Sequence, residues 1–286
     1  KRPLDYPNVV HLELSSRCNA NCKMCPHHRL SRPRRDMPTE TARRVILDWP
    51  PGDIDRASLF FFGEPLLQPD LVELVVLLGE RQPRAMIYLT TNGQLLTPEL
   101  SAELWRAGLN ALAVSYQGDD PGLHEQLMRG IVNETVERNI FAAEAARRRI
   151  NPRAVFKINS LLLPETTARE QAIRELWSRR DIPLELTPVH EEYRILDPTE
   201  PVEALRQRPC PQIFDSVTVY AHGAVGFCCS DPDASLSIGD VNEEPLGRIW
   251  LGRKAAELRR RQLTGNFSRE PICASCTYDL LRGPVF

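Results

Sequence analysis

The stretch "SSRCNANCKMCPHH", residues 15–28, places Cys18, Cys22 and Cys25 on one short segment with the spacing C-x3-C-x2-C. It follows the alternating run "VVHLEL" (9–14), which predicts a β-strand. The chain has only eight cysteines, so three of them on one loop indicate metal or redox chemistry. Three thiolates do not complete a tetrahedral site. Either a fourth ligand comes from elsewhere, or one coordination position is left open.

The bulk composition is that of a soluble globular protein. The chain has 286 residues, of which 42% are hydrophobic and 26% charged, with a formal net charge of −2. Nothing in this balance favours a nucleic-acid or membrane partner. No apolar run approaches the roughly 20 residues of a membrane helix, and no secretory signal is visible. We therefore expect a cytoplasmic protein, where clustered cysteines are metal or redox ligands more often than disulfides.

Short apolar runs alternate with helical patterns over the first two thirds of the chain. Six such alternations predict a parallel sheet wound right-handedly, with helices outside. Six units are too few to close an eight-stranded barrel, so the expected fold class is α/β, a partial (β/α)6 barrel over residues 1–195. The predicted strands are 9–14, 57–62, 86–90, 112–116, 154–163 and 184–189, and the predicted helices lie within 38–49, 68–80, 97–108, 133–149 and 165–177.

A smaller α+β domain is predicted over residues 196–286, after a segment rich in proline and charge. The stretch "SVTVYAHGAVGFCC" (216–229) predicts a hairpin that turns at His222-Gly223. Residues 245–263 predict one amphipathic helix with Leu246, Ile249, Trp250 and Leu258 as its apolar stripe. This domain holds the other five cysteines, and small domains often depend on a metal for stability.

The first cysteine group suits a cubane iron–sulfur cluster. The loop follows the first strand, and in such sheets ligands bind beyond the carboxyl ends of the strands. A [4Fe–4S] cluster has four irons, so three cysteines leave one iron for a ligand that is not protein. The alternative is a zinc site that borrows His27 or His28 as its fourth ligand.

The triple C-x3-C-x2-C after a first strand resembles the signature of the radical S-adenosylmethionine (SAM) superfamily. The resemblance implies that SAM chelates the open iron and is cleaved by an electron from the cluster, which gives a 5′-deoxyadenosyl radical that takes a hydrogen atom from substrate. That electron comes from an external one-electron donor such as flavodoxin or ferredoxin.

Other segments resemble the motifs of this family in the same order along the chain. They are "FGEP" (62–65), "TTNG" (90–93), "VSYQG" (114–118) and "LHEQLMRG" (123–130). Phe62 replaces the usual first glycine of the GGEP motif, and Met24 stands where an aromatic residue is common. The cofactor-binding residues that the resemblance implies are Met24, Gly63, Glu64, Pro65, Thr91, Asn92, Ser115, Arg129 and Asn159.

The second cysteine group is spaced as Cys210-x17-Cys228-x44-Cys273-x2-Cys276. It resembles the auxiliary-cluster domains called SPASM and twitch, and the lack of further cysteines after Cys276 favours the shorter twitch form with one auxiliary [4Fe–4S] cluster. Either Cys228 or Cys229 is the hairpin ligand, and the hairpin register favours Cys228. A structural zinc held by the same four thiolates is the alternative. Two [4Fe–4S] clusters and SAM are thus the expected cofactors.

Over essentially its whole length, the sequence resembles twitch-type alcohol dehydrogenases of aminocyclitol antibiotic biosynthesis. It implies a radical SAM oxidoreductase that oxidises an alcohol of a small polyhydroxylated substrate to a ketone, with the auxiliary cluster taking one electron. The hydroxyl proton needs an acceptor, and the candidates Glu191, Tyr193 and Arg194 lie in "HEEYRILDP" (190–198). Lys157 is a weaker candidate.

Three alternatives stay open from the sequence. A redox-neutral dehydration or epimerisation of a similar substrate would use the same cofactors. Maturation of a ribosomal peptide by crosslinking would too, although the barrel begins within about ten residues of the first residue, so we expect no N-terminal peptide-recognition module. A zinc-binding scaffold without enzymatic activity is the third.

Overall fold

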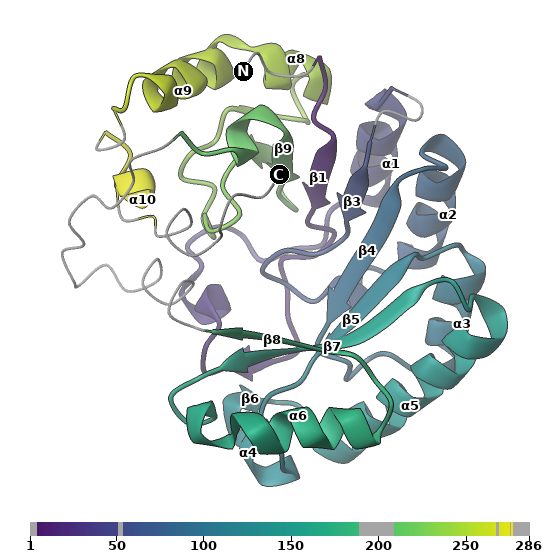
Figure 1. Cartoon of the computed structure of the whole chain (residues 1–286). Helices are drawn as coiled ribbons and strands as arrows, with labels where there is room; N and C mark the ends of the chain where they lie inside the picture. The colour runs from purple at the N-terminus through teal and green to yellow at the C-terminus, as the bar shows by residue number, and fades with distance from the viewer. Residues whose placement is uncertain (1–4, 51–53, 189–208, 267–268, 275, 277–286) are drawn as a thin grey trace.

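The computed structural model describes residues 5–50, 54–188, 209–266, 269–274 and 276. Its centre is a mixed sheet with the strand order β11-β10-β9-β1-β3-β4-β5-β7-β8 (Figure 1). The six strands from β1 to β8 in this order are parallel and confirm the six that the sequence predicts. They are β1 (Val9–Leu12), β3 (Arg56–Ser58), β4 (Met86–Thr91), β5 (Ala111–Ser115), β7 (Val155–Leu162) and β8 (Leu184–Pro188).

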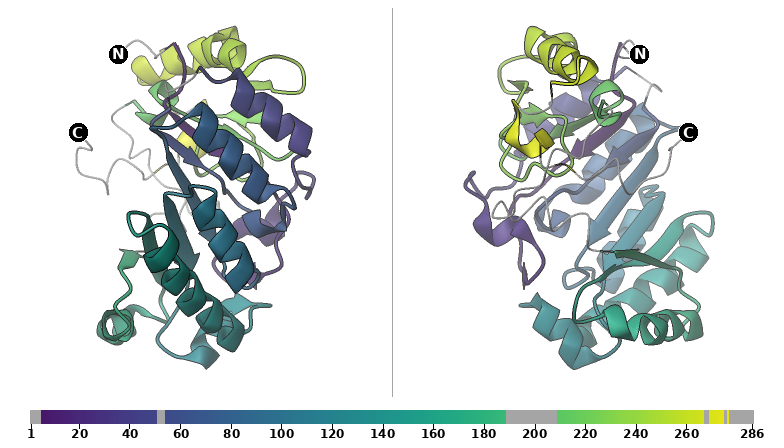
Figure 2. Two further views of the ribbon diagram at one scale, coloured as in Figure 1. Left: turned by 90° about the vertical axis from the view of Figure 1, so that its right-hand side faces the viewer. Right: turned by 60° about the vertical axis from the view of Figure 1, so that its left-hand side comes forward.

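Helices cover one face of this sheet, as Figure 2 shows from two sides. On β4 the residues Ile87 and Leu89 are buried, whereas Tyr88 and Thr90, which alternate with them, are partly exposed, so the two faces of the sheet differ. The partly exposed face lines the inside of the open barrel. The helices are α1 (Thr39–Asp48), α2 (Leu71–Arg81), α3 (Pro98–Arg106), α5 (Asn133–Ile150) and α6 (Glu170–Arg179).

The C-terminal hairpin extends the barrel sheet. Strand β9 (Ser216–Val219) pairs in parallel with β1, from Val9 opposite Ser216 to Leu12 opposite Val219. Strand β10 (Ala224–Gly226) returns antiparallel through the predicted turn, where Gly223 has a φ of +106°. Strand β11 (Gly239–Asp240) completes the edge. The domain boundary at 195/196 lies outside the described residues and stays a prediction.

The prediction of one helix over 245–263 is wrong, because the chain breaks at Gly252. Helix α8 (Leu246–Leu251) ends there, and α9 (Arg253–Leu263) begins after it. Gly252 has extended backbone angles, and a Cβ on it would lie 3.0 Å from the carbonyl oxygen of Arg248. The predicted apolar stripe is nevertheless buried on both helices.

Short elements that the sequence did not predict hold the connecting loops. Strand β2 (Asn21–Cys22) pairs antiparallel with β6 (Met128–Arg129), which directly follows α4 (Pro121–Leu127). The others are η1 (Pro26–Arg29), η2 (Pro65–Leu67), η3 (Thr167–Arg169), η5 (Gln212–Phe214) and α10 (Pro271–Ala274). Within the described ranges, no helix is long and apolar enough to cross a membrane.

Candidate active site

The first cysteine loop begins where β1 ends. Cys18, Cys22 and Cys25 are all partly buried, with Cys22 on β2 and Cys25 directly before η1. Burial raises the pKa of Cys18 to about 11 and that of Cys22 to about 12, and the neighbouring Cys25 raises both further. Three thiols that share one loop and disfavour each other's ionisation need a positively charged group to be held as thiolates. The donor set therefore fits an iron–sulfur cluster.

The "FGEP" segment (62–65), called the SAM motif below, packs with its backbone against the backbone of the cysteine loop. A Cβ on Gly63 would lie 2.1 Å from the carbonyl oxygen of Ser15 and 2.7 Å from that of Arg17. The next residue, Glu64, donates its backbone N–H to the Arg17 oxygen at 2.7 Å. Only glycine allows this approach, because any side chain at position 63 would displace the loop.

Glu64 connects the SAM motif "FGEP" (62–65) with the "TTNG" segment (90–93). Its side chain is 2% exposed, and its two oxygens accept hydrogen bonds from the Thr91 hydroxyl at 2.7 Å and the Asn92 N–H at 2.8 Å. Burial raises its pKa to about 7. The Asn92 amide in turn donates to Asn19 at 2.8 Å and approaches the Cys18 sulfur at 3.9 Å. One chain of contacts thus connects "FGEP", "TTNG" and the cysteine loop.

The other predicted cofactor residues lie around the same mouth. Ser115 ends β5 and is the register partner of Asn159 on β7. Arg129 is exposed on β6, opposite Asn21 of the cysteine loop. Met24 is partly buried and packs against an apolar cluster that includes Leu127 and Leu163. Their contacts to SAM stay predictions.

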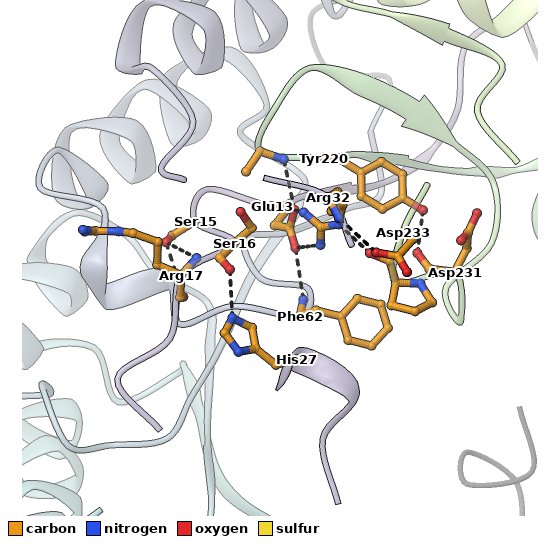
Figure 3. A network of polar contacts seen from close by, with 12 residues as sticks. Glu13, Ser15, Ser16, Arg17, His27, Arg32, Phe62, Tyr220, Asp231 and Asp233 are labelled. Atoms are coloured by element: carbon orange, nitrogen blue, oxygen red, sulfur yellow. Dashed lines mark hydrogen bonds and ion pairs between the residues drawn. The ribbon is translucent and has the colours of Figure 1, made fainter. Parts of the chain in front are cut away.

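Neither histidine beside the loop is arranged as a fourth ligand. The Nε2 of His27 lies 2.9 Å from the Ser16 carbonyl oxygen, where it donates a hydrogen bond (Figure 3). His28 is exposed, and its Nε2 accepts from Arg29 at 3.3 Å. Within the described part of the chain, no three His, Cys, Asp or Glu side chains converge as the ligands of one metal ion do.

The remaining cysteines surround a pocket at the C-terminal end of the molecule. It is lined by five cysteines, by apolar side chains and by the polar side chains of Gln212, Ser230 and Gln262. Burial raises the pKa of Cys228 well above its ordinary value, and nearby Cys229 and Cys210 add to the shift. Thiols that surround a volume rather than a point fit a cluster, whose ligands bind different irons. The lining cysteines are Cys210, Cys228, Cys229, Cys273 and Cys276, so the choice between Cys228 and Cys229 stays a prediction.

A buried ion pair that the sequence did not reveal lies between the two cysteine regions (Figure 3). The guanidinium of Arg32 donates two hydrogen bonds, of 2.7 and 2.6 Å, to the two oxygens of Glu13. The same oxygens accept the backbone N–H of Phe62, the first residue of "FGEP", and the backbone N–H of Ala221, in the hairpin turn. Glu13 therefore joins three separate segments at the barrel mouth.

Arg32 extends this network to the second cysteine region. Its Nε donates to the Pro232 carbonyl oxygen, and its guanidinium lies 5.2 Å from the centre of the Tyr220 ring. Tyr220 donates to the Asp231 carbonyl oxygen at 2.8 Å, close to the hairpin cysteines. Neither residue was singled out from the sequence, because Glu13 and the "RPRR" segment (32–35) match none of the family motifs. The predicted catalytic residues Glu191, Tyr193 and Arg194 lie outside the described residues.

A partial barrel with a thiol loop at its mouth, and a second thiol pocket beside it, defines a class of enzymes that combine SAM with iron–sulfur clusters. The sequence profile of the Radical SAM superfamily matches residues 12–176, and that of an iron–sulfur cluster-binding domain, SPASM, matches residues 210–277. The chain belongs to the radical SAM superfamily and carries a C-terminal SPASM/twitch domain. SAM and iron–sulfur clusters are therefore its cofactors.

Two curated relatives extend over nearly the whole chain. An AdoMet-dependent heme synthase of Methanosarcina barkeri is 30% identical and covers 94% of this chain and 91% of its own length. An S-adenosyl-L-methionine-dependent 2-deoxy-scyllo-inosamine dehydrogenase of Niallia circulans is 22% identical, over 94% and 92%. The structure of BtrN in complex with AdoMet and 2-DOIA superposes with a TM-score of 0.62 at 19% identity, over 97% of this chain and 94% of that one. The structure of anSMEcpe with bound AdoMet gives 0.67 at 15% identity, over 94% and 87%.

Proposed function

We propose that this enzyme oxidises a hydroxyl group of a polyhydroxylated or aminocyclitol-type small molecule to a ketone, with one [4Fe–4S] cluster in each cysteine region. The observation that carries the proposal is the second thiol pocket, which belongs to a hairpin paired directly with β1. Removal of a hydrogen atom from carbon leaves one electron and one proton to dispose of. An electron acceptor close to the barrel mouth suits that requirement. The full-length similarity to the inosamine dehydrogenase supports the substrate class.

The chain's own residues would bind, orient and enclose the reactants. Cys18, Cys22 and Cys25 would hold the first cluster, and Cys210, Cys228, Cys273 and Cys276 the second. When bound, these clusters and SAM would supply a 5′-deoxyadenosyl radical and an acceptor for one substrate electron. The buried Glu64 would keep the SAM motif fixed through Thr91 and Asn92. Arg194, Glu191 and Tyr193 remain the proposed group for the hydroxyl proton.

The barrel interior presents polar side chains to a substrate of this kind. On neighbouring strands β7 and β8, Lys157 forms an ion pair with Glu185, and its ammonium lies 5.3 Å from the centre of the Tyr88 ring. The Tyr88 hydroxyl accepts from the Asn159 amide at 3.3 Å. Glu185 is exposed and the other three side chains are partly buried, and the strand register places all four on the same face of the sheet. They would offer both donors and acceptors to a hydroxylated ring.

Product mass after anaerobic turnover tests the proposal. The reconstituted enzyme is supplied with SAM, a reductant and a panel of aminocyclitols that includes 2-deoxy-scyllo-inosamine. We expect 5′-deoxyadenosine together with a product lighter than the substrate by one H₂. A product of equal mass would instead indicate epimerisation, and loss of water would indicate dehydration.

Two cysteine variants separate the roles of the two regions. C22A removes a ligand of the first cluster, so it should form neither 5′-deoxyadenosine nor product. C210A removes a ligand of the second, so it should still cleave SAM but release no ketone. Full ketone production by C210A would contradict an electron-accepting role for the second region.

The 30% identity to a heme synthase over 94% of the chain supports a second candidate, which is action on a precursor of heme. Both candidates share the cofactors and differ in substrate. Parallel assays with an iron porphyrin precursor and with the aminocyclitols, each followed by mass spectrometry, distinguish them. A peptide substrate is tested in the same series with short precursor peptides encoded near the gene.

A further inference from the structure

Arg259, on α9, is a buried cation that no carboxylate neutralises within the described part of the chain. Its side chain is 4% exposed. Its Nε donates to the Ile213 carbonyl oxygen at 2.7 Å, and its Nη1 donates to that of Trp250 at 2.7 Å. Its Nη2 is buried and has no hydrogen-bond partner among the described residues. The neighbouring Arg260 and Arg261 pair with Glu257, but no described carboxylate pairs with Arg259.

The surroundings of this guanidinium are aromatic and dry. Its central carbon lies 4.2 Å from the centre of the Trp250 ring and 5.0 Å from that of the Phe227 ring. The two rings also contact each other edge to face at 5.6 Å. Burial lowers the pKa of Arg259 to about 10, so the group stays positively charged near neutral pH. Cation–π contacts and two carbonyl oxygens reduce the cost of burial but leave the full charge in place.

This charge lies directly behind the second thiol pocket. Phe227 and Ile213, which both contact Arg259, also line the pocket, and Phe227 immediately precedes Cys228. On the same helix, Leu258 and Gln262 line the pocket, and Gln262 accepts the backbone N–H of Cys210 at 3.0 Å. Figure 1 shows α9 lying over the β9–β10 hairpin, with α10 close by. Phe227 therefore connects the guanidinium with the pocket that the cysteines line.

We propose that Arg259 is the internal counter-charge of the auxiliary cluster and raises its reduction potential. A cluster bound by four thiolates is negative, and reduction adds a further negative charge. A fixed cation nearby stabilises the more negative state, and the burial of Arg259 reduces the screening of this interaction by solvent. A raised potential is what an acceptor of a substrate electron requires. The inference rests on the proposed cluster at these cysteines, but it does not depend on the substrate.

Potentiometric titration followed by electron paramagnetic resonance tests the proposal on the full-length, anaerobically reconstituted enzyme. The auxiliary signal is recognised because SAM perturbs only the first cluster. We expect R259Q to shift the auxiliary midpoint potential to more negative values and R259K to stay close to wild type. R260Q is the matched control, because Arg260 is exposed on the same helix, and it should leave the potential unchanged. Iron content and circular dichroism verify the fold of each variant.

Each result of these measurements either supports or overturns the counter-charge role of Arg259. An unchanged potential in R259Q, or an equal shift in R260Q, overturns the proposal. If R259Q does not retain the cluster, R259M is measured in its place, since an apolar chain packs better between the two rings. If R259Q and R259M both lose the cluster and R259K retains it, the result supports a counter-charge role for Arg259. If all three variants lose the cluster, Arg259 has a packing role and the proposal is refuted. The potential is measured without substrate, so an enzyme that makes no ketone would refute the proposed reaction and leave this result intact.

Discussion

Gly63 is the residue at which backbone geometry constrains the SAM motif most directly. Its missing Cβ would lie 2.1 Å from the Ser15 carbonyl oxygen, which is backbone and cannot rotate away. G63A should therefore weaken SAM binding at least about fivefold, because overpacking of this kind costs about 1–3 kcal/mol. Equilibrium binding of SAM to the reconstituted protein measures the effect.

Gly79, on α2, provides the control for this substitution. The nearest atom to an added Cβ there is the Ala107 carbonyl oxygen at 4.0 Å, so there is room for a methyl group. Alanine is also preferred over glycine inside a helix by about 1 kcal/mol. G79A should bind SAM like wild type and be slightly more stable. Equal SAM affinity in G63A and G79A would contradict the packing argument.

His124, in α4, gives the fold a pH dependence. The ring is fully buried, its Nδ1 accepts the Gln117 N–H at 3.1 Å, and its Nε2 has no hydrogen-bond partner among the described residues. Burial lowers its pKa from 6.5 to about 4. As the pH falls from 6.5 toward 4, His124 is protonated in the unfolded chain but not in the folded chain, so stability is lost on acidification.

The expected loss is about 2 kcal/mol between pH 7 and pH 5, from the linkage of one such group. H124N keeps an acceptor for the Gln117 N–H and removes the titration. Urea unfolding of wild type and H124N without cofactors, at both pH values, measures the difference between the two pH dependences. Parallel curves for the two proteins would show that His124 does not carry this effect.

At the scale of elements, α4 and β6 support the cysteine loop from outside. The Leu127 carbonyl oxygen, at the end of α4, accepts the N–H of Lys23 at 2.8 Å, and β6 pairs with β2, which contains Cys22. The side chain of Asp120 caps α4 by accepting the Leu123 N–H at 2.9 Å. A substitution that destabilises this short helix should therefore also disturb the site of the first cluster.

D120A and T97A compare two helix caps of similar geometry. Thr97 caps α3 by accepting the Leu100 N–H at 3.2 Å, and α3 packs against α5 and α2. Each loss of a cap should cost about 1 kcal/mol in the free energy of unfolding. Only D120A should also weaken SAM binding, as measured on the reconstituted proteins. An equal effect of both variants on SAM affinity would mean that α4 is not a specific support.

The elements that the sequence predicted are those whose signals are local. Each of the six parallel strands overlaps a short run rich in apolar, β-branched or aromatic residues, and the side chain of Thr97 caps α3 directly before the Pro-Glu pair that favours a helix start. Helix α4 was missed because its seven residues include Pro121 and Gly122, which usually indicate a turn. The break at Gly252 was missed because the apolar stripe stays in phase across it.

Contacts between distant segments could not be inferred from local patterns. The motifs identified Gly63 and Glu64, because the family resemblance supplies them. The pairing of β9 with β1 joins residues about 200 positions apart, and neither strand alone specifies its neighbour. The Glu13–Arg32 pair is of the same kind, since an arginine in "RPRR" is ordinarily exposed and this one is buried. Its role follows only from the folded arrangement.

At the scale of the whole molecule, Glu13 and Arg32 connect the SAM motif with the auxiliary hairpin. The carboxylate of Glu13 accepts four hydrogen bonds, two from Arg32 and one each from the backbone of Phe62 and Ala221. Both side chains are almost completely buried. Removal of one partner leaves the other charge buried and alone, which typically costs about 3–5 kcal/mol. We therefore expect E13Q and R32Q each to destabilise the protein strongly.

The double variant E13Q/R32Q should recover part of this loss, because two neutral amides can still bond to each other and to the backbone. We expect an interaction free energy above about 1 kcal/mol in the double-mutant cycle from urea unfolding. R17Q is the control, since Arg17 pairs with Asp36 at the exposed surface and should contribute under about 1 kcal/mol. The single variants should also form more 5′-deoxyadenosine per product molecule than wild type, because the hairpin with Cys228 is then less firmly held against the SAM motif. Additive free energies in the cycle, with an unchanged ratio of 5′-deoxyadenosine to product, would show that the pair does not couple the two regions.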